Sequence, residues 1–465
     1  MDNNHRDDAI GLIEETSDGI VNREMNDGVN SDSQNESFHH SHHSHYSHHR
    51  RKKHRHRTKF FSKKNKERIG HFLAKNKRYF IHATITLVAI VCLIVAGFVI
   101  DEVYSSQKKN QWDSENQTIQ NMVNSIRIDV PFFGEDVIIV NPAVYAYYSA
   151  ENDTYASEVY DQYRTQYKRM DTGLPVKLSY ELVGAPMGYS VKEASYFIAD
   201  NPEFNNQLVY MTDSYSTDVD IYHLKTGTRY YFKIELTFND GNVTAVSGSF
   251  KTAESPRFLT VDGVYNLRDV GGWRTTDGKT IKQGLLYRGC ELDGAVEEKY
   301  TITPEGVNTM LSVLGIKTDM DLRSSADNLY GTDALGASVK HIYYNAPNYS
   351  GIFDNPEPIR KVFSDLADQS NYPIYLHCTY GQDRTGTICY LLGAILGMDE
   401  SSLMKEYQLS AFHHSDVSMD WMYKFIGRIN GLPGENINEK IERWLLSIGV
   451  TAEEIASVRD MFLSE

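Results

Sequence analysis

Apolar and polar residues divide this 465-residue chain into distinct regions. Residues 1–78 are polar, and residues 79–100 are predominantly apolar. From about residue 131 to residue 254, short segments alternate between apolar and polar positions, with the period of β-strands. From residue 255 to residue 465, apolar runs of strand length are separated by amphipathic stretches of helix length. The pattern predicts a multidomain chain with one apolar helix, an all-β domain and a C-terminal α/β domain.

The apolar run Tyr79–Ile100 is expected to cross a membrane. Its 22 residues include no acidic or basic side chain apart from His82, and at about 1.5 Å per residue they span the hydrocarbon core of a bilayer. A buried helix of a soluble domain would carry a polar face, which this run lacks, and the run begins too far along the chain for a cleaved signal peptide. Residues 101–130 are polar and are interpreted as a stalk, with a short helix expected over Ile119–Ile126.

The charges on the two sides of this helix predict its orientation. Residues 50–78 contain fourteen Lys or Arg and one Glu, whereas Asp101 and Glu102 open the other side. Positive residues are retained on the cytoplasmic side of membranes. We therefore expect a single-pass protein of the cell membrane, with a cytoplasmic N-terminus and with residues 101–465 extracellular.

The N-terminal tail, residues 1–78, is predicted to be disordered. Residues 1–49 carry ten acidic and two basic side chains without apolar periodicity. Nine histidines between His39 and His56 could bind zinc or nickel, but their irregular spacing also fits a solvated tail. Beyond the apolar run the chain holds 31 Lys or Arg against 51 Asp or Glu, a net charge of −20. Such a surface repels nucleic acid, which we exclude as a partner.

Residues 131–254 have the pattern of a β-sandwich. Lys177–Leu182 alternates with period two, as do the apolar residues from Tyr230 to Leu236, and Asp240-Gly241 supplies a hairpin turn. The segment that ends at Tyr230, LKTGTRY, resembles the one that leads into the sixth strand of fibronectin type III domains. This resemblance implies that Tyr230 is a tyrosine corner, with its hydroxyl bonded to backbone upstream.

Two further segments bear on this resemblance. Ser247–Thr252 is similar to the last strand of the fibronectin type III domain. A polar, Tyr-rich insertion at Ala150–Arg169 departs from the pattern of that domain. The tyrosines of the insertion could take part in binding, although packing is the favoured interpretation.

The candidate chemistry lies in ten residues, His377–Gly386, with the sequence HCTYGQDRTG. The preceding Pro373–Leu376 is a short apolar run typical of a strand, and Thr387–Leu396 is apolar and followed by Gly397, as a helix would be. The ten residues are therefore expected to form a loop between a strand and a helix. The N–H groups of such a loop converge at a helix N-terminus, where an anion such as phosphate is favoured.

The residue types in this loop fit phosphoryl transfer. The helix N-terminus and Arg384 favour the thiolate of Cys378, which can attack phosphorus and form a phosphocysteine intermediate. Arg384 offers a planar fork of donors to two phosphate oxygens. His377 is expected to orient the loop, and the mechanism needs no metal or other cofactor. We predict phosphate-binding roles for Thr379, Tyr380, Gly381, Gln382 and Thr385, of which Thr385 would also donate to the leaving sulfur.

The loop resembles that of the cysteine-dependent protein tyrosine phosphatases, and in particular a bacterial family whose loop reads H-C-x-x-G-K-D-R-T-G. The resemblance implies a parallel-dominated central sheet flanked by helices over residues 255–465. It also implies activity on phosphotyrosine and, in some members, on phosphoserine, phosphothreonine or phosphoinositides. Gln382 stands where the family has lysine, which weakens the case for multiply phosphorylated inositol lipids. Four further blocks resemble the family: Asn266–Gly272, Leu285–Arg288, Gly315–Arg323 and Trp444–Val450.

A general acid must protonate the leaving oxygen, and a carboxylic acid usually does so. Asp383 is the first candidate because it lies in the loop, and the resemblance implies that it is functional. Asp321 is expected at the carboxyl end of a parallel strand, where α/β sheets place their sites. Alternatively, Asp321 forms a salt bridge to Arg323 or Arg288. Asp354 is the third candidate, or else a solvated loop charge.

The cysteines do not form a disulfide framework. Cys389 is expected in the core, on the helix that follows the loop. Cys290 follows a block that the resemblance places near the active site, so an oxidising exterior could join it to Cys378 in a disulfide.

Helices are predicted over Pro304–Leu314, Pro358–Ala367, Thr385–Leu396 and Ser402–Leu409, followed by a helical C-terminal region. Within that region Thr451 and Glu454 are expected to form a capping box.

The most direct interpretation is a phosphatase for protein phosphotyrosine. Two alternatives stay open: a phosphatase for lipid, sugar or polymer phosphates, and a surface protein that binds phosphorylated ligands without hydrolysing them. The substrate in the first two cases is a phosphomonoester, and the membrane is contacted through one helix.

Overall fold

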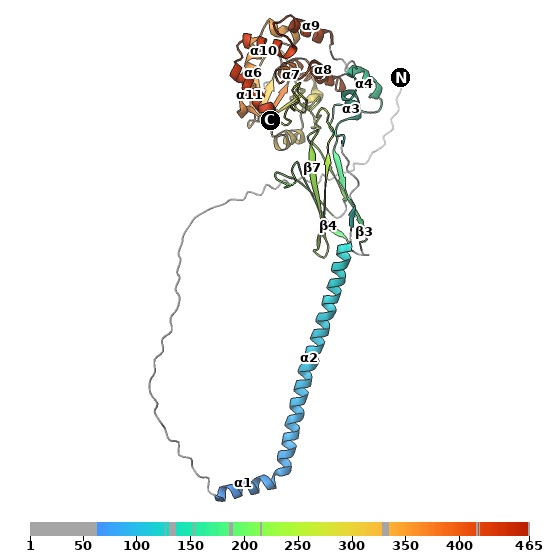
Figure 1. The fold of residues 1–465 in the computed structure, drawn as a ribbon, viewed down its shortest axis with the longest axis vertical. Coiled ribbons are helices and arrows are strands. Elements are labelled where there is room, and N and C mark those ends of the chain that lie inside the picture. Colours follow the sequence, from blue (N-terminus) through green and yellow to red (C-terminus); the bar gives the residue numbers. More distant parts are fainter. Residues whose placement is uncertain are drawn as a thin grey trace, which may run out of the picture. The chain divides into compact units, whose positions relative to one another are not determined.

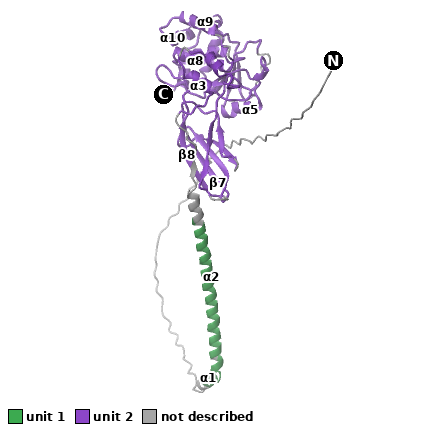
Figure 2. Cartoon of the chain, turned by 90° about the vertical axis from the view of Figure 1, so that its right-hand side faces the viewer, with its two compact units in different colours: residues 1–125 green, residues 126–465 purple. Residues whose placement is uncertain are grey.

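The chain forms two compact units, residues 1–125 and residues 126–465 (Figures 1 and 2). The His-rich tract and the predicted disorder of residues 1–62 lie outside the described residues, whereas residues 63–75 and 77–78, also predicted to be disordered, belong to helices. A computed structural model describes residues 63–125, 127–129, 136–151, 154–185, 189–213, 216–327, 334–414, 417 and 419–463.

The described part of the first unit consists of two helices, α1 (Lys63–Lys75) and α2 (Lys77–Ser125). Part of α2 is long and apolar enough to cross a membrane, with a mean hydropathy of 2.8, and none of that part is buried in the protein. The helix continues without interruption to Ser125, so the short helix expected over Ile119–Ile126 belongs to a longer one. The end of the predicted stalk is not helical, because Arg127–Asp129 forms a strand that pairs with Glu181–Val183. The sequence from residue 101 to residue 125 contains neither glycine nor proline, so nothing in it stops the helix.

The second unit begins with antiparallel sheets that share one apolar core. The strand β7 alternates strictly along its length, with Tyr230, Phe232 and Ile234 among its buried residues. The four-stranded sheet has the order β5-β4-β7-β8, while β2 pairs with β6 and β1 with β3. The bounds of these strands are β1 Arg127–Asp129, β2 Val176–Ser179, β3 Glu181–Val183, β4 Val191–Ala199, β5 Leu208–Asp213, β6 Asp218–Ile221, β7 Arg229–Phe238 and β8 Val243–Lys251.

Two local contacts in this part were expected from the sequence. The hydroxyl of Tyr230 accepts a hydrogen bond from the backbone N–H of Lys225, at 2.8 Å, which is the upstream contact predicted for this tyrosine. The turn between β7 and β8 contains Gly241 with a φ of 86°, a conformation that glycine adopts without strain.

The Tyr-rich insertion forms helical structure that packs on the C-terminal part of the chain. It follows α3 (Pro142–Tyr148) and includes α4 (Ala156–Tyr163). Both helices bury residues, such as Tyr147 and Val159, in the core that also contains residues of the C-terminal sheet, such as Met320 and Ile374. In Figure 1 they lie beside α8. The stretch predicted as part of the sandwich thus shares its core with the C-terminal domain.

The C-terminal part has a five-stranded sheet in the order β12-β11-β13-β10-β9. The three pairings from β12 to β10 are parallel, and β9 pairs with β10 antiparallel. The central strand, β13, is buried along its whole length. The strands are β9 Arg268–Asp269, β10 Leu286–Gly289, β11 Thr318–Asp321, β12 Lys340–Tyr343 and β13 Ile374–His377.

Helices flank this sheet close to their predicted positions. Thr451 and Glu454 form the expected capping box, in which each side chain accepts a hydrogen bond from the backbone N–H of the other. The helix predicted from Pro304 begins as α5 but continues as one π turn, η2. The bounds are α5 Pro304–Asn308, η2 Thr309–Val313, α6 Glu357–Leu366, α7 Asp383–Ile395, α8 Glu400–Gln408, α9 Met419–Asn430, α10 Ile437–Ser447 and α11 Ala452–Phe462, with shorter turns η1 Glu298–Tyr300, η3 Tyr349–Phe353, η4 Gln369–Asn371 and η5 Leu409–Phe412.

Candidate active site

The loop between β13 and α7 lies at the carboxyl end of the parallel strands, where open α/β sheets bind their ligands. Cys378 directly follows β13, and only 4% of its surface is exposed. Asp383 is the first residue of α7, and Arg384 the second. The structure therefore places the predicted nucleophile and the predicted phosphate-binding arginine at the two ends of one short loop, against the N-terminus of α7.

The carbonyl groups of this loop are held on its outer side by residues from other segments. Because a peptide carbonyl and the N–H that follows it point in opposite directions, these bonds turn the N–H groups toward the inside of the loop. Among the described residues, the N–H groups of Tyr380 and Gly381 donate to no protein acceptor. A ring of inward N–H groups is an anion site. Three bonds hold the carbonyls: Glu291 N–H to Thr379 O (3.0 Å), Asn266 Nδ2 to Tyr380 O (3.0 Å) and Arg288 Nη2 to Gly381 O (2.6 Å).

Gly381 is the one loop position that only glycine can occupy. Its φ is 65°, in the left-handed region. A Cβ atom added there would lie 2.2 Å from the carbonyl oxygen of Gly289, which is backbone and cannot move aside. The loop therefore has to pass directly over the end of β10.

We expect Gly381→Ala to lower kcat/KM by about 100-fold or more, since a loop displaced by about 1 Å misplaces its N–H groups. The measurement is steady-state hydrolysis of p-nitrophenyl phosphate by the full chain. Gly241→Ala is the matched control: its φ of 86° is also positive, but no atom lies within 4 Å of the added Cβ. Equal activity of the two variants would contradict the steric argument.

A buried ionic triad supports the loop from behind. Glu406 accepts from Arg288 Nη1 at 2.7 Å and from Arg268 Nε at 3.0 Å. Burial by itself would raise the pKa of Glu406, but the two guanidinium groups lower it. Burial, together with the neighbouring charge of Arg288, lowers the pKa of Arg268 to about 10. Both arginines belong to segments whose sequence resembles the phosphatase family, whereas nothing in the sequence around Glu406 indicates that it pairs with them.

Arg384 is oriented by a carboxylate that sequence reasoning missed. Its Nη1 donates to Oδ2 of Asp327 at 3.0 Å, and about a quarter of its side chain is exposed. Burial opposes ionisation of Asp327, but the hydrogen bonds from Ser324 and Arg384 lower its pKa. Asp327 lies in a turn beyond β11, and nothing in its sequence context marks it as a partner of the loop.

His377, the residue before the nucleophile, is enclosed by carboxylates. Its Nε2 lies 3.0 Å from Oδ1 of Asp319, and both side chains are at least 95% buried. Burial alone would lower the pKa of His377, but Asp319 and Asp321 raise it to about 9. A protonated imidazole is therefore locked beneath the loop at neutral pH, consistent with an orienting role.

This pair predicts a pH dependence of stability. The pKa of His377 in the folded protein lies above the unfolded value of about 6.5. Its contribution to the free energy of unfolding is therefore fully present below about pH 6.5 and is lost as the pH rises through about 9. We expect the free energy of unfolding to fall over this range, and to fall less in His377→Gln. Urea unfolding at several pH values measures both slopes. His341→Gln on β12 is the control, and an unchanged slope in His377→Gln would contradict the prediction.

The three candidate acids lie in different surroundings. Asp321 is fully buried and holds Arg323 with both oxygens, at 2.9 to 3.1 Å, so the structure contains the salt bridge that was considered as the alternative. Asp354 is 74% exposed and pairs with Arg428 at 3.2 Å, as a solvated loop charge would.

Asp383 is the candidate held at the loop itself. The hydroxyl of Tyr349 donates to its Oδ1, and the hydroxyl of Tyr407 lies 2.6 Å from that of Tyr349. Burial and the charge of Asp383 raise the pKa of Tyr349, so this phenol stays protonated and can act as the donor. The interaction fixes the carboxyl group of Asp383 beside the loop.

Two other cysteines lie near the loop. Cys389 is buried in α7, as expected. Cys290 is buried one residue beyond β10, and both it and Cys378 are free thiols. Its sulfur accepts from the N–H of Tyr265 and donates to the carbonyl of Glu291, each at 3.2 Å, and burial raises the pKa of this thiol.

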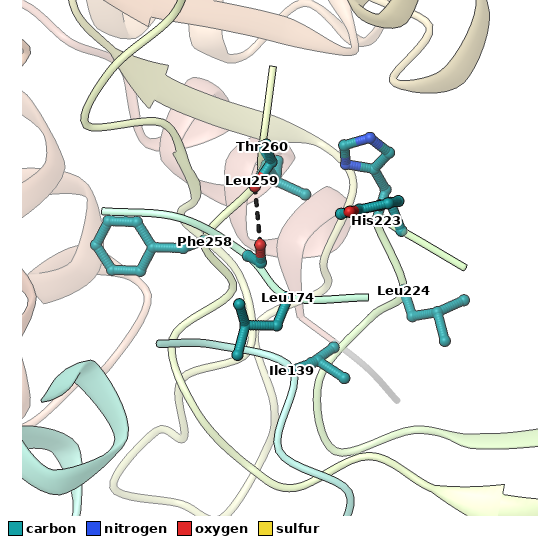
Figure 3. A pocket seen from close by; sticks show the side chains of 9 residues that line it. Ile139, Leu174, His223, Leu224, Phe258, Leu259 and Thr260 are labelled. Carbon is teal, nitrogen blue, oxygen red and sulfur yellow. Dashed lines mark hydrogen bonds between the residues drawn. The ribbon is translucent and has the colours of Figure 1, made fainter. Parts of the chain in front are cut away.

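A separate small pocket lies where the sandwich meets the C-terminal domain (Figure 3). None of its lining residues is a predicted site residue. The pocket is lined by Ile139, Gly173, Leu174, Tyr222, His223, Leu224, Phe258, Leu259 and Thr260.

Known proteins that are similar to this chain include tyrosine phosphatases. Residues 259–464 match the model of the tyrosine phosphatase family. A "putative tyrosine-protein phosphatase" of Cupriavidus necator is 25% identical over 177 residues, covering 32% of this chain and 61% of the relative. A "tyrosine-protein phosphatase" of Nostoc commune is 25% identical over 126 residues, covering 22% of this chain and 43% of the relative. The chain thus spans less than two thirds of either relative.

Solved structures also match this chain, among them a yeast phosphatase domain. The core catalytic domain of the PP-IP phosphatase SIW14 from S. cerevisiae, in complex with citrate, aligns with 31% of this chain and 86% of its own. The identity is 18% and the TM-score 0.23. The family match and the two relatives show that residues 259–464 are similar to tyrosine phosphatases, and they support a phosphatase activity.

Proposed function

We propose that this protein is a membrane-anchored, extracytoplasmic phosphatase that hydrolyses phosphomonoesters, with protein phosphotyrosine as the preferred substrate. The observation that carries the proposal is the loop of residues 378–384. Its carbonyls are bonded outward, its N–H groups turn inward, and a cysteine and an arginine stand at its ends.

In the first step the thiolate of Cys378 attacks phosphorus, the S–P bond forms and the P–O bond to the leaving group breaks. Arg384, oriented by Asp327, and the loop N–H groups stabilise the charge on the phosphoryl oxygens. Asp383 supplies the proton to the leaving oxygen, and the hydroxyl of Tyr349 positions it.

In the second step water attacks phosphorus, Asp383 takes the proton, and the S–P bond breaks to release phosphate and thiolate. Thr385 is suited to assist this departure, because its hydroxyl is fully buried and has no partner among the described residues. A buried hydroxyl without a partner can donate its hydrogen bond to the thiolate as it forms, and this bond stabilises the leaving sulfur.

Aromatic surroundings favour a phosphotyrosine substrate. Tyr380 is part of the loop, and its ring packs edge-on against Tyr300, with 6.0 Å between centroids. The exposed His414 lies 5.6 Å from the same ring. Gln382 lacks the positive charge that would help to bind additional phosphates. A substrate with one phosphate on an aromatic ring fits these neighbours better than an inositol polyphosphate does.

The test of substrate class uses the full chain in detergent micelles. We expect kcat/KM to be higher for a phosphotyrosine peptide than for the same peptide with phosphoserine, and higher than for inositol phosphates. Faster hydrolysis of a lipid, sugar or polymer phosphate would overturn the substrate assignment. Binding of inorganic phosphate without turnover of any substrate would favour the non-catalytic alternative.

The membrane placement is supported by the exposed apolar part of α2 and by the basic residues that precede it. A C-terminal epitope tag on the chain, expressed in intact cells, tests the orientation. Protease added outside the cells should remove the tag without lysis. Protection of the tag until lysis would reverse the orientation, and release of the chain from membranes by carbonate would exclude the anchor.

A further inference from the structure

Residues 141–173, here called the arm, precede the family-matched region but pack directly against it. The backbone N–H of Ala156 donates to Oε1 of Gln408 at 3.1 Å. Nζ of Lys405 donates to the carbonyls of Tyr148, at 3.1 Å, and Ala150, at 2.7 Å. These bonds fix the backbone of the arm to α8, the helix that also carries Glu406 of the ionic triad.

The far end of the arm is also fixed, at the pocket in Figure 3. The carbonyl of Gly173 accepts from the hydroxyl of Thr260 at 2.8 Å. A Cβ atom on Gly173 would lie 2.4 Å from the carbonyl oxygen of Phe258, so the backbones of these two segments are in direct contact. The arm is thus anchored at both ends to the catalytic domain.

Between these anchors the arm carries a buried carboxylate, Asp171, of which only 1% is exposed. One of its oxygens accepts from the backbone N–H of Asn266 at 2.7 Å. Nε of Arg169 and Nδ1 of His413 each lie 3.1 Å from an oxygen of this carboxylate. Burial opposes ionisation, but His413 and Arg169 lower the pKa of Asp171 to about 2, so it is a carboxylate throughout the working range.

Asn266 connects this carboxylate to the phosphate-binding loop. Its Nδ2 donates to the carbonyl of Tyr380 at 3.0 Å and to the hydroxyl of Ser410 at 3.2 Å. Its φ of 53° is in the left-handed region, which asparagine tolerates better than most residues but does not adopt without support. The hydrogen bond from its N–H to Asp171 provides that support.

We propose that Asp171 is a positioning residue of the active site, which acts through Asn266 on the peptide of Tyr380, and that the arm is therefore part of the catalytic unit. This inference rests on the proposed function of the loop. If Asp171 no longer holds Asn266, the carbonyl of Tyr380 loses its fixed partner. The following N–H group then no longer points steadily at the phosphate.

The first test is Asp171→Asn in the full chain, which keeps the shape of the side chain but removes its charge. We expect kcat/KM for p-nitrophenyl phosphate to fall by about 10-fold to 100-fold, with a matching loss of affinity for inorganic phosphate. Asp161→Asn is the control, because Asp161 lies on the same arm in an exposed pair with Arg164 at 3.2 Å. The control should keep the wild-type kcat/KM and phosphate affinity.

The second test asks whether the effect passes through Asn266. Asn266→Gly removes the amide that holds Tyr380 while tolerating the positive φ. The double variant Asp171→Asn, Asn266→Gly should lose no more phosphate affinity than Asn266→Gly alone, because both changes break one connection. Losses that add independently would overturn the proposed route.

Calorimetric binding of inorganic phosphate separates this inference from the proposed function, since it needs no turnover. Absence of turnover by the wild type, with phosphate still bound, contradicts the proposed function but leaves the effect of Asp171 measurable. A lower unfolding temperature in Asp171→Asn with unchanged phosphate affinity would reduce Asp171 to a structural residue and overturn the proposal. Asp171→Glu is measured as well. It retains the charge but moves the carboxylate away from the N–H of Asn266, so this variant should fold but bind phosphate more weakly.

Discussion

Replacing Cys378 with serine is expected to lower phosphatase activity of the full chain by at least about 10,000-fold. The serine hydroxyl stays protonated near neutral pH, so no anion attacks phosphorus and no phosphoenzyme forms. The loop N–H groups and Arg384 are untouched, so inorganic phosphate should still bind with affinity similar to that of the wild type. Hydrolysis of p-nitrophenyl phosphate and calorimetric binding of phosphate measure the two effects on the same preparation.

The matched control is Cys92→Ser, the same substitution at an exposed position on α2. It should retain full activity in detergent. Mass spectrometry of wild-type protein quenched in acid during turnover should find a phosphate on the peptide that contains Cys378. Residual activity above a few per cent in Cys378→Ser, with Cys92→Ser unchanged, would refute the nucleophile.

Replacing Glu406 with glutamine should have the largest effect on stability. It leaves two buried arginines, Arg268 and Arg288, without a counter-charge, and breaking a buried ion pair in this way costs about 3–5 kcal/mol. Arg288 also loses the partner that aims it at the carbonyl of Gly381, so phosphate affinity should fall as well. Urea unfolding followed by tryptophan fluorescence, together with phosphate binding, measures both.

The control is Glu357→Gln, which removes one partner of an exposed pair with Arg360 at 3.0 Å. Exposed pairs contribute little because water and salt screen them, so the unfolding midpoint should change little. If Glu406→Gln unfolds at the same urea concentration as this control, the triad does not carry the support that we assign to it.

The active-site loop is held in place by segments from far along the chain. The bonds to its carbonyls come from Glu291, Asn266 and Arg288, and Asn266 is in turn held by Asp171. A loop fixed from outside keeps its N–H groups oriented before substrate arrives, and such preorganisation is the largest contribution that most enzymes make to stabilising developing charge. A boundary drawn at residue 255 would remove Asp171 and with it one of these supports.

Local sequence determined the features that depend on neighbouring residues. The strand–loop–helix around Cys378 was visible from the apolar run Pro373–Leu376 and from the apolar run that precedes Gly397. The loop is shorter than the ten residues expected, because His377 ends β13 and α7 already begins at Asp383. The capping box at Thr451 follows from two residues three apart. The alternation around Tyr230 predicted both the strand and the hydroxyl contact with upstream backbone.

Only the tertiary structure decided which distant residues complete the site. Asp327, Glu406 and Asp171 are ordinary acidic residues in their local sequence, and their roles come from meeting Arg384, the buried arginines and Asn266 across many residues of chain. Asp321 pairs with a residue only two positions away, Arg323, but the local pattern also allowed it as an acid, and it is the burial of both side chains in the folded protein that decided between the two. Periodicity and capping act over a few residues. Burial, which determines the partners of these charged side chains, exists only once the sheet and the arm have packed together.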